Sequence, residues 1–151
     1  MATLKISDLS VGDWVEFHRK QGIYIAPPLF DHANAQIVGT HRGAEVSLLV
    51  DGKREFMAIP LSAIRPIPIS AEILEKNGWS TDGMYAFLRI DEHRHLEYYY
   101  HEHRLRKYYC GVDEWQNHAK VNNITFAVHC YSVHQLQHAL RLAGVDKGIN
   151  L

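Results

Sequence analysis

Cysteine is scarce in this sequence, and no segment has the length of apolar chain that a membrane requires. The 151 residues include two cysteines, Cys110 and Cys130, which form neither a disulfide framework nor a Cys-x-x-Cys pair. This usage excludes the small disulfide-rich class and suits a reducing compartment. The longest apolar runs, such as residues 46–50, fall far short of the roughly 20 residues of a membrane helix, and residues 1–10 lack a signal-peptide core. We therefore expect a soluble, cytoplasmic protein.

An excess of charge of one sign is also missing. Sixteen Lys and Arg residues against 17 Asp and Glu residues give a formal net charge of −1. No broad basic field exists to attract long duplex DNA or an anionic membrane, so any anion site must be local. The sequence contains no Gly-x-Gly-x-x-Gly or P-loop motif and no Gly-x-Ser-x-Gly turn, which removes the usual signatures of dinucleotide-binding domains, P-loop NTPases and serine hydrolases.

Apolar residues and histidines are what the sequence does contain. Hydrophobic residues make up 46% of the chain, which is enough for a packed core. The length fits one medium domain or two very small ones. Eleven residues are histidine, and eight of these lie in residues 93–151. The second half of the chain is therefore chemically distinct from the first.

The first half has the pattern of a small β module. Residues 11–17, 36–40, 45–50 and 53–59 read as short strands. Asp51-Gly52 is the dipeptide of a tight hairpin, and residues 61–64 favour a short helical turn. Residues 26–34 contain two prolines and read as a surface loop. We predict a small SH3-like β barrel over residues 1–68.

The second half has the pattern of an α+β module, and it follows a hinge at residues 65–69, where two prolines prevent a helix or a central strand. Helices are predicted over residues 71–77, capped by Ser70, and over residues 133–143, capped by Ser132 and ended by Gly144. Residues 84–90, 96–110 and 124–130 read as strands, and residues 111–118 as a loop. We predict an antiparallel sheet with two packed helices over residues 69–151, and hence an α+β fold overall.

The C-terminal part of the chain resembles a known group of sequences. The motif is VHQLQHALRL at residues 133–142, preceded by the strand-like residues 124–131. With residues 9–15 and the RPIPI segment at 65–69, it resembles the signature of a family of uncharacterised proteins from gut bacteria of the Bacteroides group, their mobile elements and their phages. The resemblance covers most of the chain and implies a small accessory protein of phage or mobile-element origin, such as an anti-defence factor. It implies no activity and no catalytic residues.

The densest cluster of chemically useful side chains interleaves tyrosines with cations in residues 98–109. In a strand, Arg104 and Arg106 project to one face, which we expect them to share with Tyr98, Tyr100 and Tyr108. Rings can stack on bases while cations meet phosphates. The alternative is ordinary sheet packing with solvated charges. The predicted ligand-binding residues are Tyr98, Tyr100, His101, His103, Arg104, Arg106, Lys107 and Tyr108.

Two histidine patterns are compatible with a metal ion. The His-x-His pairs at His93, His95 and at His101, His103 lie near Asp91, Glu92, Glu97 and Glu102, and they are the metal ligands if the protein holds a metal. The alternative is a solvated hairpin. His134 and His138 share one helix face, but Gln135 replaces the glutamate of a zinc-protease helix, so hydrogen bonding beside the core is the preferred interpretation.

These observations favour a non-enzymatic binding protein without a cofactor. Its predicted ligand is a phosphorylated or nucleotide-like small molecule, which a phage-encoded protein could sequester. Two alternatives stay open. One is a metal-dependent hydrolase or nuclease that uses the His-rich strands. The other is a protein-interaction module that holds a host protein or a second copy of the chain.

Overall fold

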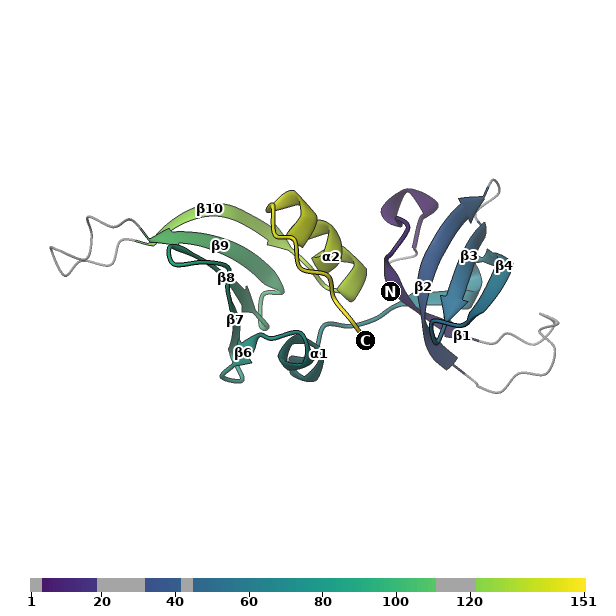
Figure 1. The fold of residues 1–151 in the computed structure, drawn as a ribbon, viewed down its shortest axis with the longest axis horizontal. Helices are drawn as coiled ribbons and strands as arrows, with labels where there is room; N and C mark the ends of the chain where they lie inside the picture. Colours follow the sequence, from purple (N-terminus) through teal and green to yellow (C-terminus); the bar gives the residue numbers. More distant parts are fainter. Residues whose placement is uncertain (1–3, 19–31, 42–44, 111–121) are drawn as a thin grey trace, which may run out of the picture. The chain divides into compact units, whose positions relative to one another are not determined.

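The protein consists of two compact units, residues 1–67 and residues 68–151. The structure, a computed structural model, describes residues 4–18, 32–41, 45–110 and 122–151 (Figure 1). Two antiparallel five-stranded sheets and two α-helices make up most of the described chain, which confirms the predicted α+β class. In the ranges described, no helix is both long enough and apolar enough to span a membrane.

The first unit is built around one antiparallel sheet with the strand order β4-β3-β2-β1-β5. Its elements are η1 (Ile6–Asp8), β1 (Trp14–His18), β2 (His32–His41), β3 (Glu45–Val50), β4 (Arg54–Pro60), η2 (Leu61–Ala63) and β5 (Ile64–Pro66). Alternate residues such as Val15, Phe17 and Leu48 are fully buried in one apolar cluster. The period-two pattern of the sequence therefore identifies the core face of this sheet.

The hairpin between β3 and β4 is confirmed at its predicted dipeptide. Asp51 and Gly52 have φ angles of 53° and 64°. Both lie in the left-handed region, as a tight hairpin turn requires at its two central residues. The backbone N–H of Lys53 donates to the carbonyl oxygen of Val50 at 3.1 Å and closes the turn.

Two other expectations for the first unit had different outcomes. The predicted loop at residues 26–34 is wrong for its last three residues, because residues 32–34 belong to β2 and pair with β1. Residues 26–31 lie outside the described chain. Pro66 lies in β5 at one end of the sheet order, which agrees with the prediction that this segment avoids a central strand.

The second unit is an antiparallel meander with a helix at each end of the chain segment. Its elements are α1 (Ala71–Lys76), β6 (Ser80–Thr81), β7 (Tyr85–Arg89), β8 (Arg94–Tyr99), β9 (Arg104–Cys110), β10 (Asn122–His129) and α2 (Val133–Leu142). The strand order is β10-β9-β8-β7-β6. Figure 1 shows α2 lying along this sheet. The buried residues of the helices include Leu74 of α1 and Leu136 and Leu140 of α2, and α2 also buries the polar side chains of His134 and Gln137.

The prediction of one long strand over residues 96–110 is wrong. The chain reverses at residues 100–103, so this segment supplies β8 and β9 of a hairpin. The turn contains no Gly, Pro or Asn, and His103 has a left-handed φ of 51°. Its conformation is held from outside the turn, because the N–H of Tyr100 donates to the carbonyl of Met84 at 3.2 Å and the N–H of Cys130 donates to that of His103 at 2.8 Å. Local turn signals therefore could not reveal it.

The predicted helix caps are partly confirmed. The Ser70 hydroxyl accepts a hydrogen bond from the N–H of Ile73 at 3.3 Å, as an N-cap should. Ser132 does precede α2, but its hydroxyl pairs with Nδ1 of His134 at 3.0 Å and makes no cap hydrogen bond. Gly144, with a φ of 70°, follows the C-terminal end of α2. The loop predicted at residues 111–118 lies outside the described chain.

Candidate functional site

The two faces of the sheet in the second unit differ in chemistry. One face is apolar and carries Ala86, Leu88, Leu96, Tyr98 and Leu105, all buried. The other face, here called the outer face, carries rings and charges on β7, β8, β9 and β10. Its members are Tyr85, Phe87, Arg89, His95, Glu97, Tyr99, Arg104, Arg106, Tyr108, Ile124, Ala127 and His129. Cations and aromatic rings are therefore concentrated on the face opposite the apolar core.

Tyr98 lies inside the core. Its side chain is fully buried, and its hydroxyl donates to the carbonyl oxygen of Cys130 at 2.8 Å and lies 3.1 Å from Nδ1 of His103. The expectation that Tyr98 shares a face with Arg104 and Arg106 is wrong. The turn at residues 100–103 changes the phase of the alternation, so that Tyr99 is the residue paired with Arg104.

The turn also contains three of the residues predicted to bind the ligand. Tyr100, His101 and His103 lie in the turn rather than in a strand. Tyr100 is partly buried, and its ring meets that of Tyr98 edge-on at 5.3 Å. Tyr100 therefore does not belong to the outer face, contrary to the prediction that it joins the two arginines.

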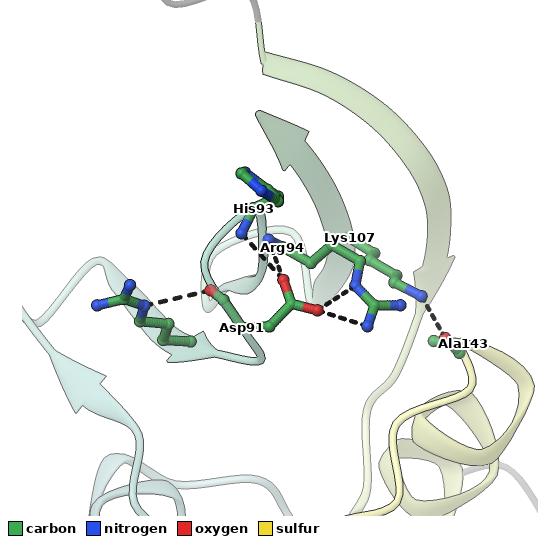
Figure 2. Close-up of polar contacts among 6 residues, drawn as sticks. Asp91, His93, Arg94, Lys107 and Ala143 are labelled. Atoms are coloured by element: carbon green, nitrogen blue, oxygen red, sulfur yellow. Dashed lines mark hydrogen bonds and ion pairs between the residues drawn. The ribbon is translucent and has the colours of Figure 1, made fainter. Parts of the chain in front are cut away.

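Lys107 lies on the apolar face. Its Nζ donates a hydrogen bond to the carbonyl oxygen of Ala143 at 2.5 Å (Figure 2). Ala143 is the C-cap of α2, where carbonyl groups lack helical partners and the helix dipole is negative. The ammonium group therefore stabilises the end of α2, and the geometry gives Lys107 no access to a ligand on the outer face.

Arg104 and Arg106 converge on one carboxylate. Nη1 of Arg104 lies 3.2 Å from Oε2 of Glu102, and Nη2 of Arg106 lies 4.0 Å from the same oxygen. Arg106 is more enclosed than Arg104, because its Nη1 also contacts Oε1 of Glu97 at 3.8 Å and the hydroxyl of Tyr108 at 3.4 Å. Arg104 thus pairs closely with an oxyanion that the chain itself provides, and Arg106 lies at the outer limit of an ion pair with the same oxygen.

Aromatic rings lie next to Arg104 and Arg106 on the outer face. Tyr85 and Tyr99 stack with ring centroids 4.8 Å apart and an interplanar angle of 21°. Tyr99 is the cross-strand partner of Arg104. His95 and Tyr108 form a second stacked pair at 5.0 Å, but Tyr108 is only 9% exposed. The Tyr85–Tyr99 pair is therefore the more accessible ring surface on this part of the outer face.

The local electrostatics distinguish the cations of the outer face. Burial lowers the pKa of His95, while the nearby Glu97 opposes that change. The hydrogen bond to the Tyr108 hydroxyl raises the pKa of Arg106. At neutral pH the arginines, rather than His95, therefore supply the positive charge of this surface.

The histidines predicted as metal ligands do not converge. His93 lies in the turn before β8 and His95 within that strand, whereas His101 and His103 lie in the turn after it. The two pairs are thus near opposite ends of one strand. Within the described ranges, no three His, Cys, Asp or Glu side chains are grouped so that they could hold a metal ion.

The other histidine pair, on α2, and Cys130 lie in or beside the buried core. His134 is 2% exposed and pairs with the hydroxyl of Ser132, and the rings of His134 and His138 are 6.1 Å apart and nearly perpendicular. Cys130 is buried, and burial raises the pKa of its thiol to about 12. A thiol with this pKa is a poor source of the thiolate that nucleophilic chemistry needs.

Several residues of the outer face are not among those predicted from the sequence. They include the exposed residues Phe87, Ile124 and His129, the neighbouring Tyr131, and the stacked rings of Tyr85 and Tyr99. Residues 85–89 alternate Tyr, Ala, Phe, Leu, Arg, with the rings and the arginine on one side. That alternation was the available signal for Tyr85 and Phe87.

Comparisons of the chain with family models, with curated proteins and with solved structures find no match. The resemblance of residues 133–142 to sequences from Bacteroides-group bacteria and their phages therefore stays a prediction. The function of the protein must be inferred from the geometry of the outer face.

Proposed function

We propose that the outer face binds a small anionic ligand of the nucleotide class, and that the protein acts by binding rather than by turnover. The observation that carries this proposal is the convergence of Arg104 and Arg106 on Oε2 of Glu102. A phosphate oxygen carries negative charge, as that carboxylate oxygen does, and the arginine guanidinium group forms charge-assisted hydrogen bonds with both. The stacked Tyr85–Tyr99 pair lies beside Arg104, because Tyr99 is the cross-strand partner of that arginine.

Displacing Glu102 costs little free energy. Its side chain is 42% exposed, and that of Arg104 is 36% exposed. Ion pairs at such positions contribute about 0–1 kcal/mol to stability. Hydrogen bonds between arginine and phosphate are charge-assisted and contribute about 1.5–3 kcal/mol each. An incoming phosphate can therefore replace the carboxylate with a net gain.

The rings provide the second half of the recognition. A nucleobase that stacks on an aromatic side chain gains about 1–3 kcal/mol. The cross-strand pairing of Tyr99 with Arg104 places a ring and a guanidinium group next to each other. A nucleotide likewise carries a base for the ring and a phosphate for the guanidinium group within one molecule. The near-zero net charge of the chain favours a small ligand over a long polyanion.

A thermal-shift screen tests this function. The purified protein is heated with nucleoside mono-, di- and triphosphates and with cyclic nucleotides, each near a millimolar. A bound nucleotide raises the melting temperature, because it stabilises the folded state only. The double variant Arg104→Ala/Arg106→Ala should lose this increase, with affinity reduced more than tenfold.

A matched control keeps the screen decisive. Arg54 and Arg65 are exposed arginines of the first unit, and their double change to alanine should leave the nucleotide effect intact. Arg104→Ala alone replaces the double variant if the loss of Arg106 impairs folding, since Arg106 also contacts Glu97 and Tyr108. Absence of any nucleotide effect on the wild-type protein near a millimolar would refute the proposal.

The finer fold of the first unit is part of the same proposal. We infer an SH3-like module, which is supported by the strand order β4-β3-β2-β1-β5 and by the short 3-10 turn η2 between β4 and β5.

We further propose that the protein is a phage or mobile-element accessory factor that sequesters a host nucleotide signal. The sequence resemblance supports this role, and identification of the bound nucleotide from expressing cells tests it.

A further inference from the structure

A second ring surface lies on the opposite side of Arg104 from Tyr99. The geometry of this surface points to a ligand in which two nucleobases are joined through a phosphate. This inference rests on the proposed function above. The first base stacks on Tyr85 and Tyr99, the second on His129 and Tyr131, and the linking phosphate meets Arg104.

The second ring surface is exposed and ordered by its neighbours. Tyr131 is 57% exposed, and its ring is nearly parallel to that of His129, with centroids 6.3 Å apart and an interplanar angle of 15°. The ring centroids of His103 and Tyr131 are 4.9 Å apart. Nδ1 of His129 is 3.1 Å from the carbonyl oxygen of Glu102. This surface therefore adjoins the turn that carries Glu102, whose carboxylate contacts Arg104.

The register of the sheet places Arg104 between Tyr99 of the first ring surface and His129 of the second. Tyr99 pairs with Arg104 across β8 and β9, and Arg104 pairs with His129 across β9 and β10. The backbones of neighbouring strands are about 4.8 Å apart, so the backbones of Tyr99 and His129, two strands apart, are separated by roughly 10 Å. One base cannot stack on both surfaces at this separation. Two bases splayed apart, as proteins bind them in single strands, can do so.

The linking phosphate is assigned to Arg104, which lies between the two ring surfaces in the register of the sheet. Arg106 is held by Glu97 and Tyr108 as well as by Glu102, whereas Glu102 is the acidic partner of the more exposed Arg104. A free dinucleotide and two adjacent nucleotides within a longer single strand share this chemistry. The experiment must therefore distinguish these two sources.

Calorimetric titration of the full chain with three probes makes the distinction. The probes are adenosine 5′-monophosphate, the linear dinucleotide ApA and a single-stranded hexamer of adenylate. Because each stacked base contributes roughly five- to hundredfold in affinity, ApA should bind at least fivefold more tightly than the mononucleotide. A hexamer that binds no better than ApA identifies a free dinucleotide, and one that binds more tightly identifies a segment of single strand; both results support two linked bases.

Two tyrosine variants locate the second base. Tyr131→Ala should reduce the affinity for ApA to that for the mononucleotide, while mononucleotide binding stays unchanged. Tyr109→Ala is the matched control, because Tyr109 is 40% exposed on the same sheet but alternates onto the face that carries Lys107. This control should bind all three probes as the wild-type protein does.

The outcomes separate this inference from the proposed function. Equal affinity for the mononucleotide and ApA overturns the inference and leaves the proposed function standing. An ApA preference that survives Tyr131→Ala also overturns it, because the second base then lies elsewhere. If neither probe binds the wild-type protein and the wider nucleotide screen is negative, the proposed function itself fails.

Discussion

The hydroxyl of Tyr98 donates a hydrogen bond to the carbonyl oxygen of Cys130 at 2.8 Å, and thereby joins β8 to the segment between β10 and α2. The same hydroxyl lies 3.1 Å from Nδ1 of His103 in the β8–β9 turn. The two elements that carry Glu102 and Tyr131 are thus tied together beneath the outer face. The arrangement of the proposed site depends on this buried contact.

Tyr98→Phe tests that dependence. The change removes the hydroxyl without changing the ring, and leaves the buried carbonyl of Cys130 without this donor. We expect the free energy of unfolding to fall by about 1–3 kcal/mol, the cost of an unsatisfied buried polar group. Urea denaturation measures it. A stability equal to that of the wild-type protein would show that the contact does not hold the turn in place.

Lys107→Met separates a structural role from a ligand-binding role. Methionine keeps most of the apolar stem but loses the charged hydrogen bond to Ala143 (Figure 2). We expect a loss of about 1.5–3 kcal/mol in the free energy of unfolding and no change in nucleotide affinity at temperatures where the variant is folded. Lys147→Met, at an exposed position, is the control and should change stability by less than about 0.5 kcal/mol. Weakened binding without loss of stability would contradict this assignment.

Asp91 gives the turn before β8 a defined dependence on pH. Oδ2 of Asp91 accepts hydrogen bonds from Arg94, with Nε at 2.6 Å, and Oδ1 accepts from the backbone N–H groups of His93 and Arg94 (Figure 2). The Arg94 side chain is the main cause that lowers the pKa of Asp91 to about 2. The unfolded value is about 3.9, so the stabilisation is complete above that pH and is lost as pH falls towards 2.

A carbon-detected NMR titration of the Asp91 carboxyl group checks the sign. The midpoint should lie near pH 2, and it should move up towards the unfolded value in Arg94→Gln. Arg89→Gln is the control, because Arg89 contacts only the backbone carbonyl of Asp91 among the contacts described. A midpoint near 3.9 in the wild-type protein would show that Arg94 does not hold the carboxylate.

Ala58→Gly should stabilise the first unit. Ala58 has a φ of 56° at the register shift between β3 and β4, a left-handed conformation that costs an alanine roughly 1–2 kcal/mol and costs glycine little. After subtraction of the greater chain entropy of unfolded glycine, we expect a gain of roughly 0.5–1 kcal/mol by urea denaturation. The same change at Ala33, in regular β2, should destabilise. A loss of stability in both variants would refute the strain at Ala58.

The sequence allowed most strands and both helices to be predicted, because these follow from local patterns. The hairpin at Asp51 and Gly52 has a dipeptide that suits left-handed φ angles, and the helix after Ser70 has a normal cap. The α2 helix shows the three- and four-residue spacing of Val133, Leu136 and Leu140 that its buried face requires.

The turn at residues 100–103 could not be predicted from local pattern. Its conformation depends on backbone hydrogen bonds to the carbonyl oxygen of Met84 and from the N–H of Cys130, and both residues lie outside the turn. Because the sequence patterns did not predict this turn, they assigned Tyr98 and Tyr99 to the wrong faces of the sheet. The predicted site therefore included Tyr98 instead of Tyr99. The arginines were correctly grouped with each other and with Tyr108, because these three lie within one strand. Neither the convergence on Glu102 nor the place of Tyr131 has a local signal.

Titration of adenosine 5′-monophosphate into Glu102→Gln and Arg104→Gln tests the central claim most directly. If Glu102 occupies the phosphate position, Glu102→Gln removes a competing charge and should tighten binding several-fold, with no effect on adenosine, which lacks the phosphate. Arg104→Gln should weaken binding of the monophosphate by more than tenfold, because it loses a charge-assisted hydrogen bond of about 1.5–3 kcal/mol. Opposite shifts in the two variants support the site. Unchanged or weaker binding in Glu102→Gln, or unchanged binding in Arg104→Gln, would contradict it.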